Sequence, residues 1–205
     1  MYYKSYQNMR DATWKILLDC GIDRLPVDID SICEQLGICV LSYDAGAEII
    51  ERAHLYRAVR DTNGLTFYWR DTPVILFNER KDVNQIMFTI AHEVGHIILK
   101  HVKPGDMTPA HQGTEWSSSS EEMAANQFAS RLLAPACVLW GLNIHTTEQI
   151  MEQCQITQPT AERRARRMAT LYERGKFLTS PLERKLYHQF SPYIHQAVPA
   201  RFGEA

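Results

Sequence analysis

The chain has 205 residues, of which 45% are hydrophobic and 22% are charged, a composition that is typical of soluble globular proteins. At this length we expect one main domain with an appendage rather than two catalytic domains. The 22 basic and 24 acidic residues give a net charge of −2, which excludes a protein that binds nucleic acid or anionic lipid through its global charge. No apolar run reaches the roughly 18 residues of a membrane span, and the polar first ten residues do not resemble a secretory signal. We therefore expect a cytoplasmic protein without membrane contact.

The five cysteines are scattered and form no CxxC pair, which argues against a disulfide framework and against a thiolate zinc site. We expect most of them to be buried apolar residues.

The first half of the chain is predicted to contain helices followed by β-strands. Apolar residues at helical spacing predict a helix over residues 5–20 and a shorter helix that ends before Gly37. Runs rich in β-branched and aromatic residues predict strands at 38–43, 65–69 and 74–78, the last two forming a hairpin. Pro73 should keep the turn end of this hairpin at a sheet edge.

The second half is predicted to be mainly helical. Apolar periodicity predicts helices over residues 82–101 and 120–133. Between them, residues 102–120 are rich in Pro, Gly and Ser and are expected to form a long loop or lid. We therefore divide the chain into a core of residues 1–135 and a helical C-terminal region of residues 136–205.

The helix over 82–101 carries the chemistry that the sequence reveals most clearly. It contains AHEVGHIILKH, in which His92, Glu93 and His96 form an HExxH motif. Residues four apart lie one turn apart on one helix face, so both imidazoles can bind one Zn²⁺. Glu93 lies beside the metal and can act as general base towards water that the metal activates. Gly95, inside the helix, suggests that a neighbouring helix or a substrate packs closely there.

A catalytic zinc usually has three protein ligands and one open position, so a third ligand is needed. His101 is five residues after His96, and on a continuing helix it would face away from the metal. The helix that begins near residue 120 offers two adjacent carboxylates, Glu121 and Glu122, just before two small residues that would allow close helix packing.

Two segments of the chain together resemble the ImmA/IrrE family of zinc metallopeptidases: FTIAHEVGHIILKH at 88–101 and ExxANxFAxxLLxP at 122–135. The resemblance implies an α+β, zincin-like fold, in which a small mixed or antiparallel sheet supports the active-site helix. It further implies one zinc ion held by His92, His96 and Glu122, with Glu93 as the catalytic base and Asn126 orienting a ligand from outside the metal shell. The implied substrate is a helix-turn-helix repressor of the Xre type, cleaved to release genes of a mobile element or a stress response.

The sequence offers several residues for substrate contact but does not choose among them. Tyr56, Tyr68, His54 and His111 could each stabilise an oxyanion. His111 could also bind metal or be an ordinary solvated histidine of the loop. The strand at 74–78 leads almost directly into the HExxH helix, and an extended peptide could pair with it if it is an edge strand. If its edge is covered, it is an ordinary sheet strand.

The C-terminal region carries a basic helix in a helix-turn-helix layout, TEQIMEQC, QITQ and PTAERRARRM. A solvated or protein-docking surface explains it better than DNA contact, because the overall charge is slightly acidic and no base-reading Asn or Gln pattern is evident. The alternative to a peptidase is therefore a non-catalytic regulator that contains zinc and binds a repressor or DNA. We prefer the enzyme, because a structural zinc site would be closed by a fourth protein ligand and no cysteine lies near the motif.

Overall fold

The computed structural model describes residues 6–105 and 120–197. The chain forms two compact units, one of residues 1–9 and 29–129 and one of residues 10–28 and 130–205. Residues 10–28 are thus grouped with the C-terminal helices. The predicted division at residue 135 placed these residues with the core instead. In the described ranges, no helix is long and apolar enough to cross a membrane.

The first unit contains the predicted strands and the HExxH helix. Its elements are α2 (Ile29–Gln35), β1 (Cys39–Ser42), α3 (Ala47–Arg52), α4 (Tyr56–Asp61), β2 (Gly64–Trp69), β3 (Thr72–Phe77), α5 (Val83–Ile98) and the first part of α6 (Ser120–Leu133). The sequence predicted all of these except α3 and α4. Each of those helices has only six residues, too few to establish a helical period.

The three strands form a mixed sheet in the order β1-β3-β2, with β1 parallel and β2 antiparallel to β3. The turn between β2 and β3 consists of Arg70 and Asp71, both with positive φ, as a type I′ hairpin turn requires. Pro73 pairs only with β2, because the ladder between β1 and β3 begins at Val74. The interpretation of residues 74–78 as an edge strand open to a peptide is therefore wrong: β3 is the central strand, and its neighbours cover both edges.

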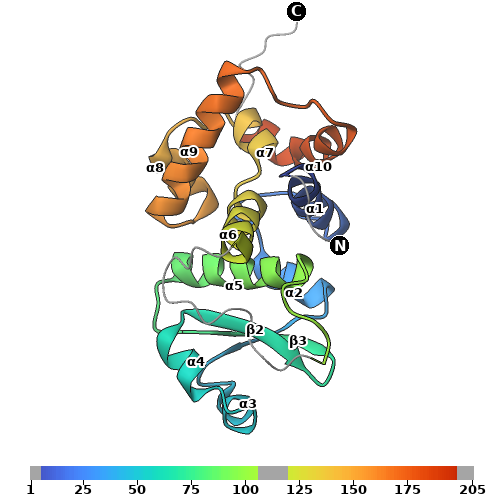
Figure 1. The fold of residues 1–205 in the computed structure, drawn as a ribbon. Coiled ribbons are helices and arrows are strands. Elements are labelled where there is room, and N and C mark those ends of the chain that lie inside the picture. The colour runs from blue at the N-terminus through green and yellow to red at the C-terminus, as the bar shows by residue number, and fades with distance from the viewer. Residues whose placement is uncertain (1–5, 106–119, 198–205) are drawn as a thin grey trace, which may run out of the picture. The chain divides into compact units, whose positions relative to one another are not determined.

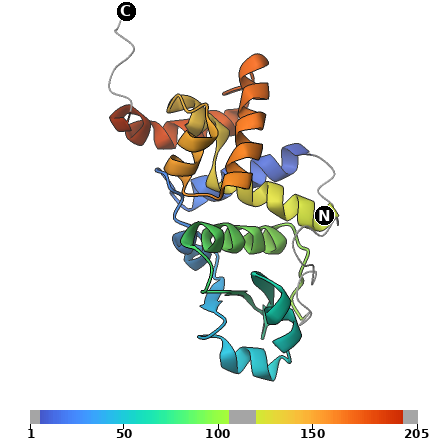
Figure 2. The ribbon, with the colours of Figure 1, turned by 90° about the vertical axis from the view of Figure 1, so that its left-hand side faces the viewer.

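Each face of the sheet is covered by helices (Figures 1 and 2). On one face, Leu65, Phe67, Val74 and Leu76 pack with apolar residues of α3 and α4 into a buried cluster. Alternate strand residues point to opposite faces, so Gly64 and Thr66 face the other way, towards α5. The side chain of Thr89 in α5 indeed lies against Gly64. The sheet thus serves as the platform on which α5 lies.

Both ends of α5 have well-defined capping. At its start, the Asp82 carboxylate accepts a hydrogen bond from the Gln85 backbone N–H at 3.0 Å, the expected N-cap contact. At its end, Lys100 has φ 62°, and its N–H donates to Ile97 O while the His101 N–H donates to His96 O. This pair of bonds is the Schellman motif, which turns the chain back over the last helical turn.

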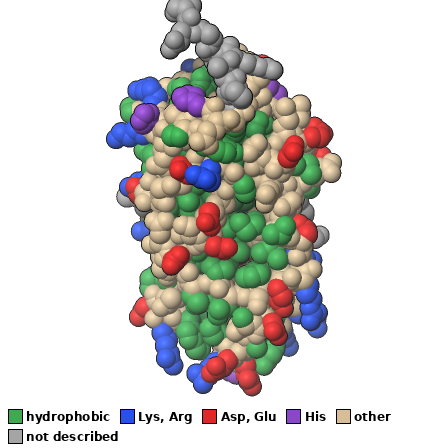
Figure 3. Space-filling view, turned by 180° about the vertical axis from the view of Figure 1, so that it is seen from behind, with side chains coloured by type: hydrophobic (Ala, Val, Ile, Leu, Met, Phe, Trp, Pro, Cys, Tyr) green, Lys and Arg blue, Asp and Glu red, His purple; other side chains and the backbone are tan. Residues whose placement is uncertain are grey.

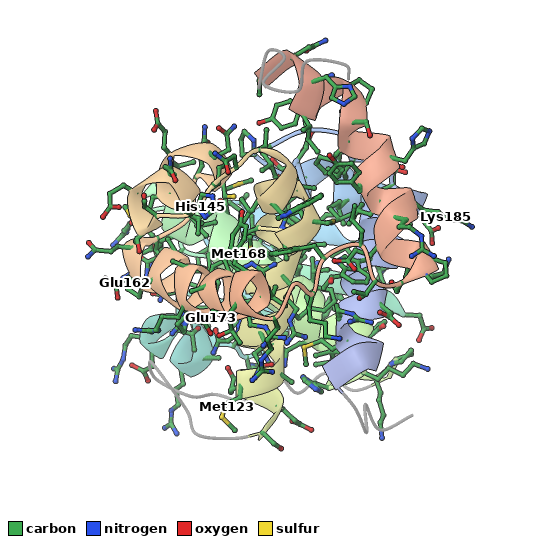
Figure 4. All side chains as sticks on the ribbon, turned by 90° about the horizontal axis from the view of Figure 1, so that it is seen from above. Met123, His145, Glu162, Met168, Glu173 and Lys185 are labelled. Atoms are coloured by element: carbon green, nitrogen blue, oxygen red, sulfur yellow. The ribbon has the colours of Figure 1, made fainter. Side chains whose placement is uncertain are left out.

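The second unit is helical in its described part. It contains most of α1 (Tyr6–Asp19), the end of α6, α7 (Ala136–Gly141), α8 (Thr147–Cys154), α9 (Gln158–Glu173) and α10 (Pro181–Ala197). Met168 of α9 lies among the helices of this unit, whereas Glu162 lies at its periphery (Figure 4).

The helices α8 and α9 are joined by a three-residue turn. Gln155 has φ 50°, Ile156 is fully buried, and Thr157 precedes the first residue of α9.

On the face of the molecule drawn in Figure 3, acidic and basic side chains are interspersed and form no continuous basic surface.

Candidate metal centre and active site

The structure brings together the side chains of His92, His96 and Glu122, all within the first unit. The two Nε2 atoms lie 3.0 Å apart. Glu122 places Oε2 3.2 Å from His92 Nε2 and Oε1 3.3 Å from His96 Nε2. Two imidazole nitrogens and the two oxygens of one carboxylate, from two helices, therefore converge on one point.

The donor set and its spacing fit a tetrahedral zinc ion. Zinc–ligand bonds of about 2.0–2.1 Å at tetrahedral angles place neighbouring ligand atoms roughly 3.3 Å apart. The two Nε2 atoms, 3.0 Å apart, are close to this spacing, and each lies 3.2–3.3 Å from one of the two Glu122 oxygens. Two imidazole nitrogens and one carboxylate are also the ligand types of many catalytic zinc sites, which keep a fourth position for water. The described residues thus provide what such a site requires.

Of the two adjacent carboxylates, Glu122 and not Glu121 contacts the histidines. Glu121 is exposed at the start of α6. Burial alone would raise the pKa of Glu122, but hydrogen bonds from His92 and His96 outweigh burial and hold that pKa well below its usual range. The carboxylate is therefore held in the charged form that a metal ligand needs.

Glu93 lies beside the cluster and is only 6% exposed. Burial raises the pKa of its carboxyl group, although the neighbouring His92 and His96 oppose this effect. A raised pKa suits a group that must accept and then release a proton near neutral pH. Gly64 contributes to this burial: a Cβ atom there would lie 2.4 Å from Thr89 Cγ2 and 3.7 Å from Glu93 Cγ, so β2 passes directly over this part of α5.

The remaining nitrogen of each histidine has a partner on the side away from the convergence point. His92 Nδ1 lies 3.1 Å from Asn126 Oδ1, and because the amide oxygen only accepts, His92 Nδ1 must donate. Its Nε2 is then free of hydrogen and available to a metal. His96 Nδ1 lies 3.0 Å from His101 Nδ1. Burial, followed by the nearby His96, lowers the pKa of His101 to about 4.

His101 was predicted to face away from the metal on a continuing helix. The structure does not include it in the candidate ligand set, but it does bring His101 into contact with His96. That prediction assumed a helix that continues to residue 101. The helix ends at Ile98, and the Schellman turn at Lys100 folds the chain back, so that the rings of His96 and His101 lie 4.9 Å apart at an angle of 72°. Sequence gave no sufficient signal, because the helix lacks the C-terminal glycine that usually marks such a turn.

Gly95 lies where α5 meets α6. A Cβ atom at this position would lie 3.1 Å from Phe128 Cδ1 and 3.3 Å from Ala125 Cα. Of the two reasons considered for a glycine inside this helix, close packing of a neighbouring helix is the one that the structure reveals. This approach brings Glu122 and Asn126 within reach of the histidines.

The residues predicted to contact substrate are dispersed. Tyr56 begins α4 and is 60% exposed, and His54 lies just before α4 with φ 55°. Tyr68 lies near the hairpin turn, at the end of β2 opposite Gly64. His111 and most of the predicted loop or lid lie outside the described residues.

Tyr43 is a neighbour of the site that sequence reasoning missed. Its hydroxyl lies 3.0 Å from Thr62 Oγ1, two residues before Gly64. Burial, with contributions from Glu93 and Glu79, raises the pKa of Tyr43 to about 12, although its hydrogen bond to Thr62 opposes this. Nothing in the sequence separates Tyr43 from the other tyrosines, since its position depends on the pairing of β1 with β3.

Comparison with known proteins identifies the family. A family model for peptidases, described as the IrrE N-terminal-like domain, matches residues 33–167, about two thirds of the chain. No curated protein and no solved structure matches the chain. The matched segment includes α5 and α6 with all three residues of the candidate metal centre. The chain therefore belongs to the IrrE N-terminal-like family of peptidases, which implies a metal, typically zinc.

Proposed function

We propose that the protein is a zinc-dependent endopeptidase whose active site is formed by α5 and the start of α6. The observation that carries this proposal is the convergence of His92, His96 and Glu122, whose nitrogen and oxygen atoms lie 3.0–3.3 Å apart, with a buried carboxylate, Glu93, directly beside it. A zinc ion held there would supply a Lewis acid for the scissile carbonyl and would lower the pKa of water.

The protein's own groups divide the remaining work. Glu93 would accept the proton of the attacking water and deliver it to the leaving amine, because its buried carboxyl group has a raised pKa. Asn126 would hold His92 in the tautomer that presents Nε2 to the metal. Gly64 and Thr89 would exclude bulk water from one side of Glu93.

An extended substrate would pair with β2. This outer strand passes over Glu93 at Gly64, whereas β3 has no free edge. Pairing with an outer strand recognises peptide backbone and requires an unfolded or flexible segment of the substrate protein. This placement replaces strand 74–78, now known to be central, as the proposed substrate partner.

For the substrate itself we propose a helix-turn-helix repressor of the Xre type. The support is the resemblance of the two motifs around residues 88–101 and 122–135 to the ImmA/IrrE family. Within this proposal, α8 and α9 form a protein-facing surface, because exposed acidic residues such as Glu173 accompany the arginines of α9.

The deciding experiment compares wild type, Glu93→Gln and Glu122→Ala, with Glu121→Ala as the matched control. Zinc content is measured by elemental analysis, and cleavage is measured by incubating each protein with purified Xre-type repressors from the same genome. We expect Glu93→Gln to retain zinc but lose cleavage, Glu122→Ala to lose both, and Glu121→Ala to resemble wild type. Full cleavage by zinc-loaded Glu93→Gln would refute the general-base role, and equal zinc in Glu122→Ala would refute the ligand assignment.

A further inference from the structure

The end of α5 brings a third histidine to the candidate metal centre without making it a ligand. His101 follows the left-handed residue Lys100 and is tied to His96 by its backbone N–H, which donates to His96 O at 2.9 Å. The same turn brings His101 Nδ1 to within 3.0 Å of His96 Nδ1. His96 and His101 are therefore linked by one backbone hydrogen bond and one hydrogen bond between their side chains.

If His96 binds a metal, the chemistry of imidazole determines which of the two rings donates the hydrogen bond between His96 and His101. A metal ligand must present an unprotonated nitrogen, so a His96 that coordinates through Nε2 carries its hydrogen on Nδ1. That hydrogen must be donated, and the atom facing it at hydrogen-bond distance is His101 Nδ1. His101 must then accept on Nδ1 and carry its own hydrogen on Nε2.

His96 needs such a partner more than His92 does. His96 is 1% exposed, so water cannot readily replace a missing acceptor for its Nδ1–H. His92 has Asn126 in the corresponding role. The two ligands of the HExxH motif are therefore each oriented by a separate group, one from α6 and one from the turn after α5.

We propose that His101 is a positioning residue that holds His96 in its metal-binding tautomer and ring orientation. The Schellman turn at Lys100 places the His101 side chain beside His96. The proposal rests on the proposed function only in taking His96 as a metal ligand. It adds a role for a residue outside the HExxH motif and outside the carboxylate helix.

The test measures zinc affinity by competition with a chromophoric chelator, without any peptide substrate. We expect His101→Phe, which fills the space but cannot accept a hydrogen bond, to weaken zinc binding about 10- to 100-fold. We expect His101→Gln, whose amide oxygen can accept, to recover most of that loss. His145→Phe, which replaces an exposed histidine in the second unit, is the matched control and should bind zinc as wild type does.

A second measurement needs no variant. In zinc-loaded wild-type protein with ¹⁵N-labelled histidine, NMR should show His96 protonated at Nδ1 and His101 protonated at Nε2 only. The inference is overturned if His101 carries its proton on Nδ1, or if His101→Phe binds zinc within about twofold of wild type. Cleavage that fails in a zinc-binding wild-type protein would instead count against the proposed function and leave the His101 result unaffected.

Discussion

Replacing Gly95 with alanine should weaken the junction between α5 and α6, although alanine is the better helix former. The added methyl group would lie 3.1 Å from Phe128 Cδ1, 3.3 Å from Ala125 Cα and 3.4 Å from Ala125 O. Two of these atoms belong to backbone, and the ring of Phe128 is fully buried, so none of the three can easily move away.

The two opposing effects can be weighed. Removing a glycine from a helix interior gains about 1 kcal/mol, and overpacking a buried contact costs about 1–3 kcal/mol. We therefore expect the free energy of unfolding of the metal-free protein to fall by up to about 2 kcal/mol. Because Glu122 lies on the helix that must shift, we also expect zinc affinity to fall about tenfold, the lower end of the range for changes outside the metal shell.

The assay combines chemical denaturation, followed by circular dichroism, with zinc titration at a temperature where the variants are folded. Gly141→Ala is the control: a Cβ there would lie 2.7 Å from Tyr187 Cε2 and 2.9 Å from Ile194 Cδ1, within the second unit. It should lower stability but leave zinc affinity unchanged. A Gly95→Ala protein that is more stable than wild type and binds zinc equally well would refute the close-packing argument.

Three further predictions concern other parts of the chain. Thr146→Ala should lower stability by about 1 kcal/mol in chemical denaturation, because it removes the capping box of α8; an unchanged midpoint would contradict this. Since folding raises the pKa of Tyr43 from 10.0 to about 12, the stability gained from its neutral form is present below pH 10 and is lost as the pH rises towards 12. Tyr43→Phe should therefore lose less stability than wild type over that interval, and parallel curves would disprove the assignment. In native protein, a thiol reagent should label the partly exposed cysteines and spare the buried ones, Cys33, Cys137 and Cys154, until denaturant is added.

The spacing of apolar residues predicted the long elements well, because it indicates which residues are buried. A long helix packs by burying one face, so its apolar residues recur at helical spacing. The helix predicted over 82–101 is found as α5, although it ends earlier, at Ile98, and the strands on either side of Arg70 and Asp71 form the expected hairpin. The HExxH motif was visible because it too is local, since its two histidines are one helical turn apart.

What the sequence could not supply were features set by non-local pairing. Strand order is one: β1 reaches β3 across two short helices and β2, and only this pairing makes residues 74–78 central. The turn at Lys100 is another, because a lysine with positive φ carries no sequence signature. The choice between Glu121 and Glu122 depends on how α6 is rotated about its axis, which the resemblance implied but local spacing left open.

The proposed ligands His96 and Glu122 lie on separate helices, roughly 25 residues apart in the chain, so neither helix alone can form the site. Zinc supply and conformational stability of the first unit are then thermodynamically linked, since only the folded unit offers the complete set of donors. At free zinc one hundred times above the dissociation constant, this linkage contributes about 2.7 kcal/mol. On the proposed function, a cell that withdraws zinc would thus lower the abundance of the folded protein as well as its catalytic competence.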